Sequence, residues 1–510
     1  MDIKYNEKNE LELQISSSLK KNMEALDAVF SEWGDIVKKE FVLERENGTV
    51  GMYIVYIDGL TDNEMVERTI TRPLLYEWRG CGPAAFQNSD VWEQIYHHQT
   101  EAVDLVEKNS MKDAVECVLN GDTAIFIDGE KKALILSTKC FPMRSIGTPQ
   151  KEAGLKGPRD SFTENFRTNT ALLRRRIKDP KMKDKQGVLG QRSRTSYGLM
   201  YMEDLVYPSL LEEIEERLNS FAIDGIFDSG MLVHLLEEKW YSPFPQVQTT
   251  ERPDKAASAI LEGRAVLVVD NSPEVIILPA TFNTFFQAAD DYYNRFAVGT
   301  FARCLRYLAA CITVLLPGLY VAIACYYPQV LPTELLLAIV GARNDVTFPI
   351  VVEVLLMELL FELLREAGIR LPGQMGNTIG VVGGLIVGQA AVEASLVSTI
   401  VVIVVALTAI ASFAIPNEEF SSTFRLLKFG MILLGAIWGL YGILLGILIL
   451  QIHLASLESF GIPYMLPVVS GSIDNEVEFQ DFAMRKPIFT MQDRPLYTRR
   501  GRRKRFRGSL

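Results

Sequence analysis

Long apolar stretches in the second half of the chain constrain its fold more than any other feature. A helix needs about 20 apolar residues to cross a bilayer. Residues 307–327 and 430–452 are uncharged runs of this length, and residues 375–415 are long enough for two spans joined by a tight turn near residues 393–395. The sequence therefore predicts an all-α helical transmembrane domain over residues 301–455, with four spanning helices.

A fifth apolar segment, residues 346–364, differs from the others because it carries Glu353, Glu358 and Glu362. Carboxylates are costly in hydrocarbon and are tolerated in membrane helices only where water or protein shields them. Glu358 and Glu362 are four residues apart and therefore share one face of a helix. We expect this segment to be a non-spanning or pore-facing helix rather than a lipid-facing span.

Two interpretations of these three glutamates stay open from the sequence. If several subunits surround an axis, one acidic helix face becomes rings of carboxylates, which favour cations, so the three side chains are candidates to line a pore. Alternatively, the segment is an amphipathic helix at the membrane surface with its acids in water. Arg343 or Arg365 is a candidate to pair with one of the carboxylates.

Charge at the two ends of the chain predicts its orientation. The N-terminal sequence MDIKYNEKNELELQ lacks the apolar core of a secretory signal, so we expect the N-terminal region to stay in the cytoplasm. Arg303 and Arg306 precede the first span, and the tail RPLYTRRGRRKRFRGSL has eight basic residues and no acid, as cytoplasmic flanks do. Two cytoplasmic termini require an even number of spans. We expect the cytoplasmic basic tail, residues 456–510, to contact anionic membrane lipid and no nucleic acid.

Rows of glycine spaced four residues apart lie in two of the expected spans. Such rows let helix backbones approach each other closely in lipid. The contacts that they make are either within one subunit or between subunits. The candidate helix-packing residues are Gly380, Gly384, Gly388, Gly435, Gly439, Gly442 and Gly446.

Two stretches of the polar N-terminal region resemble each other without a gap: AVECVLNGDTAIFIDGEKKALILS, which starts at Ala114, and ASAILEGRAVLVVDNSPEVIILPA, which starts at Ala257. Each is typical of a helix end, a glycine stop, a strand, a tight turn and a second strand. We therefore predict a soluble α/β region of two related subdomains, residues 46–150 and 151–300, after an N-terminal leader of residues 1–45. The likeness arises either from duplication or from convergence on a common pattern.

The sequence contains no residue pattern typical of an enzyme or a cofactor site. Phosphate-binding Gly-x-x-x-x-Gly-Lys loops, Gly-x-Ser-x-Gly elbows, and His-Glu-x-x-His or Cys/His zinc spacings are missing. Asp128 and Asp270 are expected as turn residues between strands. The six cysteines are scattered, which favours reduced thiols over a disulfide framework. We expect no catalytic residue, no metal and no cofactor.

Two long motifs resemble a known family. They are FPQVQTTERPDKAASAILEGRAVLVVDNSPEVIILPATF, residues 244–282, and LLLAIVGARNDVTFPIVVEVLLMELLFELLREAGIRLPGQMGNTIGVVGGLIVGQAAVEASLVSTIVVIVVALTAIASFAIP, residues 335–416. Both resemble the A subunits of the GerA family of spore germination proteins, as does GPRDSFTENFRTNTALLRRRIKDP, residues 157–180. The resemblance extends over roughly residues 45–485 of the chain.

This resemblance implies several properties that the residue patterns do not. Such proteins lie in the inner membrane of the dormant spore and act with a transporter-like B subunit, which recognises the nutrient, and with a lipoprotein C subunit. The A subunit is expected to form a homo-oligomer that conducts monovalent cations when the nutrient binds. The alternatives are a non-conducting scaffold of the same receptor complex and a related subunit associated with dipicolinate release.

Overall fold

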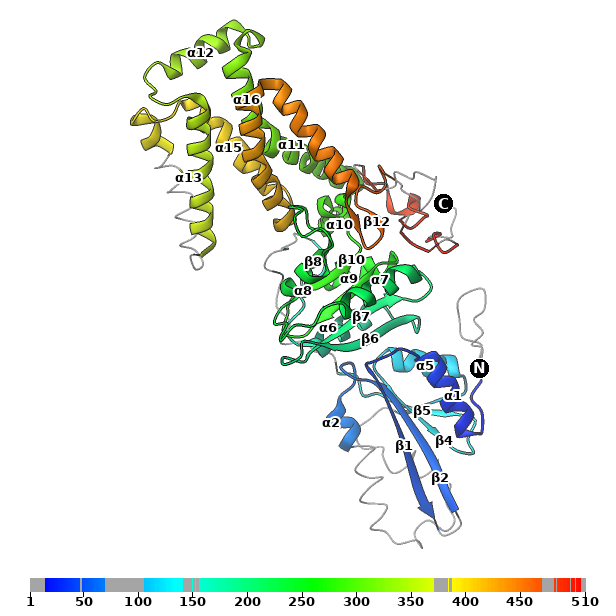
Figure 1. The fold of residues 1–510 in the computed structure, drawn as a ribbon. Helices are drawn as coiled ribbons and strands as arrows, with labels where there is room; N and C mark the ends of the chain where they lie inside the picture. Colours follow the sequence, from blue (N-terminus) through cyan, green and yellow to red (C-terminus); the bar gives the residue numbers. More distant parts are fainter. Residues whose placement is uncertain are drawn as a thin grey trace.

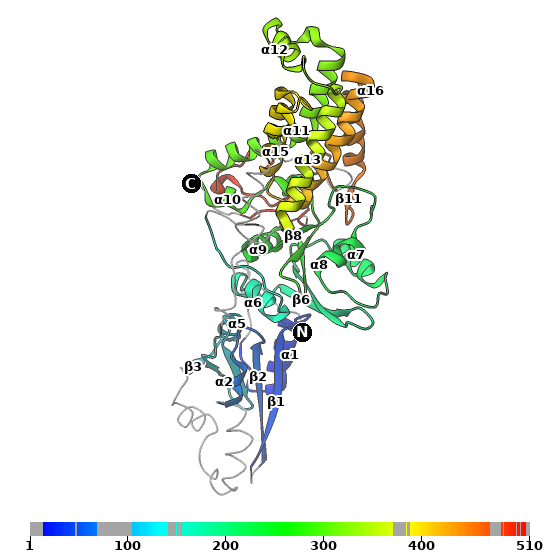
Figure 2. The same ribbon diagram turned by 90° about the vertical axis from the view of Figure 1, so that its left-hand side faces the viewer.

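The computed structural model of the protein describes residues 14–45, 48–68, 105–140, 149, 152, 156–370, 384, 388–469, 481–482, 484–495, 497–499 and 501–505. These residues form three bodies in a row, which are a first α/β subdomain, a second α/β subdomain and a bundle of long helices (Figures 1 and 2). The C-terminal segment returns to the junction between the second subdomain and the bundle (Figure 1).

The first subdomain is built on a five-stranded sheet with the strand order β1-β2-β4-β5-β3. Its elements are α1 (Leu19–Val29), β1 (Ile36–Arg45), β2 (Gly48–Ile57), α2 (Asn63–Val66), β3 (Leu105–Lys108), α5 (Met111–Leu119), β4 (Thr123–Ile127) and β5 (Ala133–Leu136). Successive strand residues point to opposite faces of the sheet. Tyr53 and Phe126 therefore pack with α1 and α5, whereas Met52 and Ile125 pack on the other face with Val66 of α2.

This first sheet begins well before residue 46. Strand β1 pairs with β2 along its whole length, from Ile36 opposite Ile57 to Arg45 opposite Gly48, and Leu26 of α1 is part of the core. The part of the expected leader from residue 19 onward therefore belongs to the first subdomain. The alternation in IVKKEFVLER is weak because an edge strand tolerates charged residues on both of its faces.

The second subdomain repeats this topology, with the strand order β6-β7-β9-β10-β8. Its elements are α6 (Phe166–Arg176), β6 (Met182–Leu189), β7 (Thr195–Met202), α7 (Pro208–Asn219), α8 (Ser229–Leu236), β8 (Gln248–Thr250), α9 (Pro253–Leu261), β9 (Ala265–Val269) and β10 (Val275–Leu278). Helices α6 and α9 cover one face of the sheet, and α7 and α8 cover the other. The predicted α/β region of two related subdomains is therefore confirmed.

Equivalent turns of the two sheets carry equivalent hydrogen bonds. The Oδ1 atom of Asp128, in the turn after β4, accepts a hydrogen bond from the backbone N–H of Leu19 at 2.9 Å. The Oδ1 atom of Asp270, in the turn after β9, accepts one from Phe166 at 3.2 Å. Each carboxylate therefore satisfies a free N–H at the start of the helix that crosses its sheet, α1 or α6. Both aspartates are turn residues, as expected, and also fix a helix to a sheet.

The glycine that follows each repeated helix is required by the backbone. Gly121 has φ of 93° and Gly263 has φ of 86°, a region that favours glycine. A Cβ atom at either position would also lie 2.9 Å from a backbone carbonyl oxygen, that of Leu60 or of Leu205. Alanine at either position would therefore meet both backbone strain and a clash.

A buried ion pair joins the two subdomains. The guanidinium of Arg174 in α6 binds the carboxylate of Asp35 through two contacts of 2.7 and 2.8 Å, and both side chains are 1 % exposed. The same guanidinium lies over the ring of Trp33 at 3.4 Å. The Nε1 atom of Trp33 donates to the carbonyl of Pro180 at 3.2 Å. These contacts fix the orientation of one subdomain on the other.

The helical bundle follows the second subdomain through two short helices. Its elements are η4 (Phe282–Phe286), α10 (Ala289–Tyr293), α11 (Phe296–Tyr326), η5 (Pro328–Val330), α12 (Thr333–Arg343), α13 (Ile350–Arg370), α15 (Thr399–Phe413), α16 (Glu418–Ser456), β11 (Glu458–Ser459), β12 (Ile462–Pro463) and η6 (Ile488–Thr490). In the part of the chain that the structure describes, α11 and α16 are long and apolar enough to cross a membrane. The turn expected near residues 393–395 is present, with Ser395 at φ of 53°.

Helix α16 is not a single straight span. Gly439 has φ of 59° and ψ of −139°, and the chain reverses there, so that residues 418–438 and 440–456 form two antiparallel arms (Figure 1). A Cβ atom on Gly446 would lie 2.5 Å from Sδ of Met431 in the opposite arm. The prediction of one span over residues 430–452 is therefore wrong. An uncharged run does not reveal a reversal when glycine alone makes the turn.

Candidate functional site

The three glutamates of the acidic segment lie on α13, and each has a cationic partner in the same chain. Glu353 is fully buried, and its Oε1 atom lies 3.1 Å from Nη2 of Arg343. Its Oε2 atom accepts a hydrogen bond from the backbone N–H of Ser398, 3.0 Å away at the start of α15. The predicted pairing with Arg343 is confirmed, whereas Arg365 pairs with Glu418 at 3.6 Å. Glu353 thus joins α12, α13 and α15.

Glu358 and Glu362 share a buried lysine. The Nζ atom of Lys428, in the first arm of α16, lies 2.6 Å from Oε2 of Glu358 and 2.9 Å from Oε1 of Glu362. Arg425, one turn earlier, lies 3.6 Å from the other oxygen of Glu362. The Lys428 and Glu358 side chains are 2 % and 1 % exposed, and Glu362 is 26 % exposed. Two carboxylates and one ammonium therefore form a compact charged triad between α13 and α16.

Removal of an ion pair from water costs several kcal/mol per ion, and close pairing offsets this cost only in part. The triad is consequently a costly feature of an otherwise apolar bundle. Lys428 lies just before the uncharged run that starts at residue 430, so a search for apolar runs does not include it. The excess of acidic residues in the segment could have predicted such a partner, because Glu358 and Glu362 require a cation from another helix.

The remaining glycine candidates lie in different environments. Gly435 packs closely against α11, because a Cβ atom there would lie 2.6 Å from the carbonyl oxygen of Gly318. Gly388 has an ordinary contact with Val402 at 3.7 Å, Gly384 has no neighbour within 4 Å, and Gly380 lies outside the described residues. Gly442, like Gly446, faces the opposite arm of α16, whereas Gly439 makes the turn.

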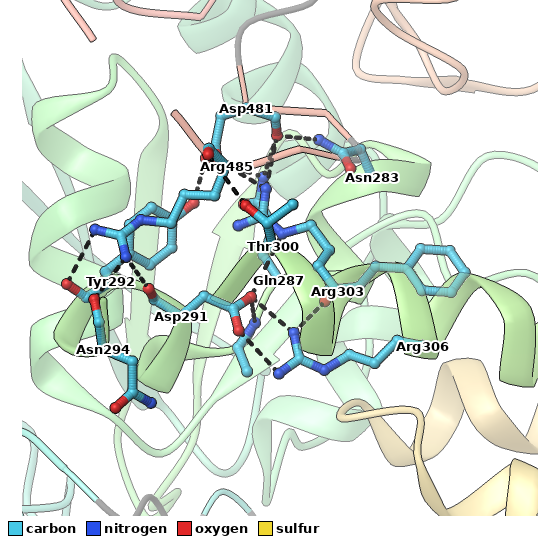
Figure 3. Close-up of polar contacts among 12 residues, drawn as sticks. Asn283, Gln287, Asp291, Tyr292, Asn294, Thr300, Arg303, Arg306, Asp481 and Arg485 are labelled. Atoms are coloured by element: carbon cyan, nitrogen blue, oxygen red, sulfur yellow. Dashed lines mark hydrogen bonds and ion pairs between the residues drawn. The ribbon is translucent and has the colours of Figure 1, made fainter. Parts of the chain in front are cut away.

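The junction between the second subdomain and α11 is a second charged cluster (Figure 3). Arg306 binds the carboxylate of Asp291 in α10 through contacts of 2.7 and 2.9 Å. Arg303, one turn earlier on α11, approaches the same carboxylate at 3.4 Å and is fully buried. The two arginines predicted as flanks of a span therefore fasten α11 to the soluble region.

The C-terminal segment completes this cluster (Figure 3). The Oδ1 atom of Asp481 lies 2.7 Å from Nη1 of Arg303, and Oδ2 accepts a hydrogen bond from the hydroxyl of Tyr292. Desolvation and the nearby Asp481 carboxylate raise the pKa of Tyr292 well above its usual range, so the hydroxyl stays protonated and acts as a donor. The Arg485 guanidinium donates to backbone carbonyls at the end of α10, including that of Asn294 at 2.8 Å. The start of α11 is thus held by α10 and by the tail.

A groove of about 260 Å³ lies beside this junction, between the second subdomain and the loop that joins α15 to α16. The cationic side chains that line it each have an acidic partner. Lys255 contacts Glu152 at 2.5 Å, Arg252 contacts Asp254 at 2.8 Å, and Arg306 contacts Asp291. Among the described residues that line it, the groove therefore presents no unpaired cation to a ligand. Within the described ranges, no group of three or more His, Cys, Asp or Glu side chains is placed to hold a metal ion.

Comparison with known proteins places these features in a family. Residues 24–497 match the family model of the Bacillus/Clostridium GerA spore germination protein. Spore germination protein KA of Bacillus subtilis is 38 % identical over 481 residues, which cover 94 % of this chain and 87 % of the relative. Spore germination protein A1 of the same organism is 39 % identical over 454 residues, covering 89 % and 91 %.

Two further proteins are similar to this chain. The uncharacterized membrane protein YfkQ of Bacillus subtilis is 38 % identical over 481 residues, covering 94 % of this chain and 91 % of the relative. The crystal structure of the N-terminal domain of the A subunit of the Bacillus megaterium spore germinant receptor GerK3 is 26 % identical, with a TM-score of 0.42, and covers 53 % of this chain and 98 % of that domain. From the family match and the identities to the germination proteins KA and A1, we conclude that this chain belongs to the GerA family of spore germination proteins.

Proposed function

We propose that this chain is the A subunit of a nutrient germinant receptor in the inner membrane of the spore, and that its helical bundle forms the cation-conducting pore of a homo-oligomer. Nutrient binding to a transporter-like B subunit opens this pore, and a lipoprotein C subunit completes the receptor. Family membership and relatives named as spore germination proteins support a role in germination.

In this proposal the bundle crosses the membrane and both termini are cytoplasmic. Support comes from contacts at one end of the bundle. Arg303, near the start of α11, contacts Asp481 of the C-terminal segment, and Ser456, at the end of α16, accepts a hydrogen bond from Lys239 of the second subdomain. The entry and the exit of the bundle therefore lie on the side of the soluble region, as an even number of crossings requires.

The observation that carries the pore proposal is the triad of Glu358, Glu362 and Lys428. Ionisable residues inside membrane helices are costly, and they mark ion pathways by default. Here two carboxylates hold an ammonium ion in the manner in which they would hold K⁺ or Na⁺. In the proposed open state the Lys428 side chain moves away, and the carboxylates of neighbouring subunits form rings that attract cations.

Spores that carry both Glu358→Gln and Glu362→Gln test this role. Glutamine keeps the size of each side chain but removes its charge, so we expect the release of monovalent cations after nutrient addition to change several-fold. The amount of receptor protein in the spore inner membrane is measured in parallel and is expected to stay normal. Normal cation release from these spores would exclude the acidic side chains as part of the pathway.

The complementary change is Lys428→Gln, measured as K⁺ flux through the purified chain in liposomes. Removal of the tethered ammonium frees two carboxylates, so we expect a larger flux than in the unmodified protein. Arg365→Gln is the matched control, because it also removes a cation from the bundle but its partner, Glu418, is 59 % exposed. An equal effect of both changes would indicate general loosening of the bundle.

The second candidate function is a non-conducting scaffold of the receptor. The observation that favours it is that Glu353, Glu358 and Glu362 are each paired with a cation inside one chain, as in a purely structural network. A scaffold passes no ions in liposomes in any oligomeric state, and its Lys428→Gln variant also passes none. The liposome experiment therefore separates the two functions.

A further inference from the structure

The loop between α8 and β8, residues 237–246, crosses from the second subdomain to the end of α16. We refer to it as the aromatic loop. Ser242 Oγ forms a hydrogen bond with Nε2 of His453 at 2.9 Å, and Lys239 Nζ donates to the carbonyl of Ser456. Gln246 closes the loop at its base, because its side chain binds both the N–H and the carbonyl group of Lys239. The loop is therefore a constrained structure attached to the bundle.

Its aromatic residues point in opposite directions. Phe244 is buried between the two arms of α16, with ring centroids 6.0 Å from Phe424 and 6.0 Å from His453. Trp240 and Tyr241 are 84 % and 62 % exposed, and their rings meet edge to face at 6.1 Å. Large aromatic side chains gain free energy from burial, so an exposed pair on a constrained loop indicates a surface that another apolar phase covers.

The position of Trp240 and Tyr241 on the bundle indicates what covers them. The Tyr241 ring lies 6.4 Å from the ring of His453. His453 directly follows the exposed apolar face of the second arm of α16, which ends at Ile452, itself 61 % exposed. The other exposed members of this face are Tyr441, Leu444, Leu445, Leu448 and Ile449. Trp240 and Tyr241 therefore lie where apolar helix surface gives way to polar surface.

A matching aromatic group lies at the other end of the bundle. Trp438 is 54 % exposed and Tyr326 is 46 % exposed, beside the turn at Gly439. Phe420, which packs with Phe244 of the aromatic loop, precedes Trp438 by 18 residues in the first arm. At 1.5 Å per residue, Phe420 and Trp438 are about 27 Å apart along the first arm, and His453, which Tyr241 contacts, is about 21 Å from the turn at Gly439 along the second arm. The hydrocarbon core of a bilayer is about 30 Å thick.

We propose that Trp240 and Tyr241 insert into the headgroup region of the cytoplasmic leaflet and anchor the second subdomain to the membrane surface. Tryptophan and tyrosine favour this region because their rings are apolar and their N–H and O–H groups are polar. Lys239 places a positive charge beside anionic headgroups. The proposal rests on the membrane location given above, and it assigns a lipid contact to the soluble region.

Tryptophan quenching in vesicles of phosphatidylcholine and phosphatidylglycerol tests this anchor. The chain has five tryptophans, so the difference between the unmodified protein and its Trp240→Phe variant isolates the emission of Trp240. Phospholipids brominated near the headgroup are expected to quench most of this emission, whereas aqueous acrylamide is expected to quench little of it. Because Trp240 is mostly exposed, its replacement by phenylalanine leaves the core intact, which circular dichroism checks.

The Trp438→Phe variant isolates the emission of Trp438 and reports whether the bundle itself is in the bilayer. If lipid quenches Trp438 while acrylamide quenches Trp240, the aromatic loop lies in water. This result disproves the anchor but leaves the membrane location of the bundle intact. If neither quencher reaches Trp240, another protein surface covers the loop, which also disproves the anchor. If the brominated lipids quench neither tryptophan, both the anchor and the proposed membrane location of the bundle are disproved.

Discussion

The two α/β subdomains share a strand order but complete their cores in different ways. In the first subdomain, the carbonyl of Leu60 accepts a hydrogen bond from the N–H of Cys140, just beyond β5, at 2.9 Å. In the second, the equivalent carbonyl of Leu205 accepts one from Arg499, in the C-terminal tail, at 2.8 Å. A local segment completes the first subdomain, whereas the second needs the segment that follows the bundle. The second subdomain is thus tied to the segments that enter and leave the bundle.

Equivalent helix positions also differ in their surroundings. Asp27 of α1 and Arg174 of α6 occupy the same place in the two repeats. Asp27 is exposed and pairs with Lys38 at 2.7 Å within its own subdomain. Arg174 is buried and pairs with Asp35 of the other subdomain. The same backbone therefore serves as a surface in one copy and as an interface in the other, because only one copy stacks its helix against a neighbour.

The Arg174→Met variant tests this difference with the largest expected effect, because it leaves the Asp35 carboxylate buried without its cation. Removal of one partner of a buried ion pair destabilises a protein by about 3–5 kcal/mol. We therefore expect the soluble region of the detergent-solubilised chain to unfold at a lower temperature. Asp27→Ala is the control and should change stability by less than about 1 kcal/mol. Equal effects at the two positions would contradict the comparison.

The Tyr497→Phe variant addresses the tail and is expected to have a smaller effect. The Tyr497 hydroxyl accepts hydrogen bonds from Nε and Nη2 of buried Arg264 at 3.0 and 2.6 Å. Loss of this acceptor should destabilise the second subdomain by about 2 kcal/mol, since a buried donor loses its partner. Hydrogen exchange should become faster in α9 and β9 but not in α5 and β4. The same acceleration in both subdomains would show that the tail does not act on the second one selectively.

The pH dependence of stability sharpens the comparison further. Burial, together with the nearby Asp35 carboxylate, raises the pKa of Asp184 from 3.8 to about 7, although Arg174 opposes this shift. The folded chain therefore binds a proton between about pH 4 and 7 that the unfolded chain releases, so this contribution to stability is lost as pH rises through that window. Asp184→Asn should flatten this slope in thermal unfolding. An unchanged slope would exclude Asp184 as its source. In the first subdomain the residue equivalent to Asp184 is Lys38 of β1, which forms a surface ion pair with Asp27.

The sequence predicted the repeated helix, glycine, strand and turn because those signals are local. Gly121 and Gly263 take the left-handed backbone, and Asp128 and Asp270 lie in the turns, as expected. Strand β1 was assigned to a leader because an edge strand needs no clear alternation. The sequence predicts only part of the candidate site. Glu353, Glu358 and Glu362 are visible in it, with Arg343 as a candidate partner, but Lys428, which binds Glu358 and Glu362, lies on another helix, 70 residues from Glu358.

The sequence by itself determined the family, the soluble α/β region with its two related halves and the apolar character of the bundle. These depend on composition, on periodicity and on local turns, which act over a few residues. Only the tertiary structure decided that α16 reverses at Gly439, that Arg174 crosses to Asp35 and that the tail completes the second subdomain. Each of these depends on which distant surfaces meet, and buried charges choose their partners by proximity in space.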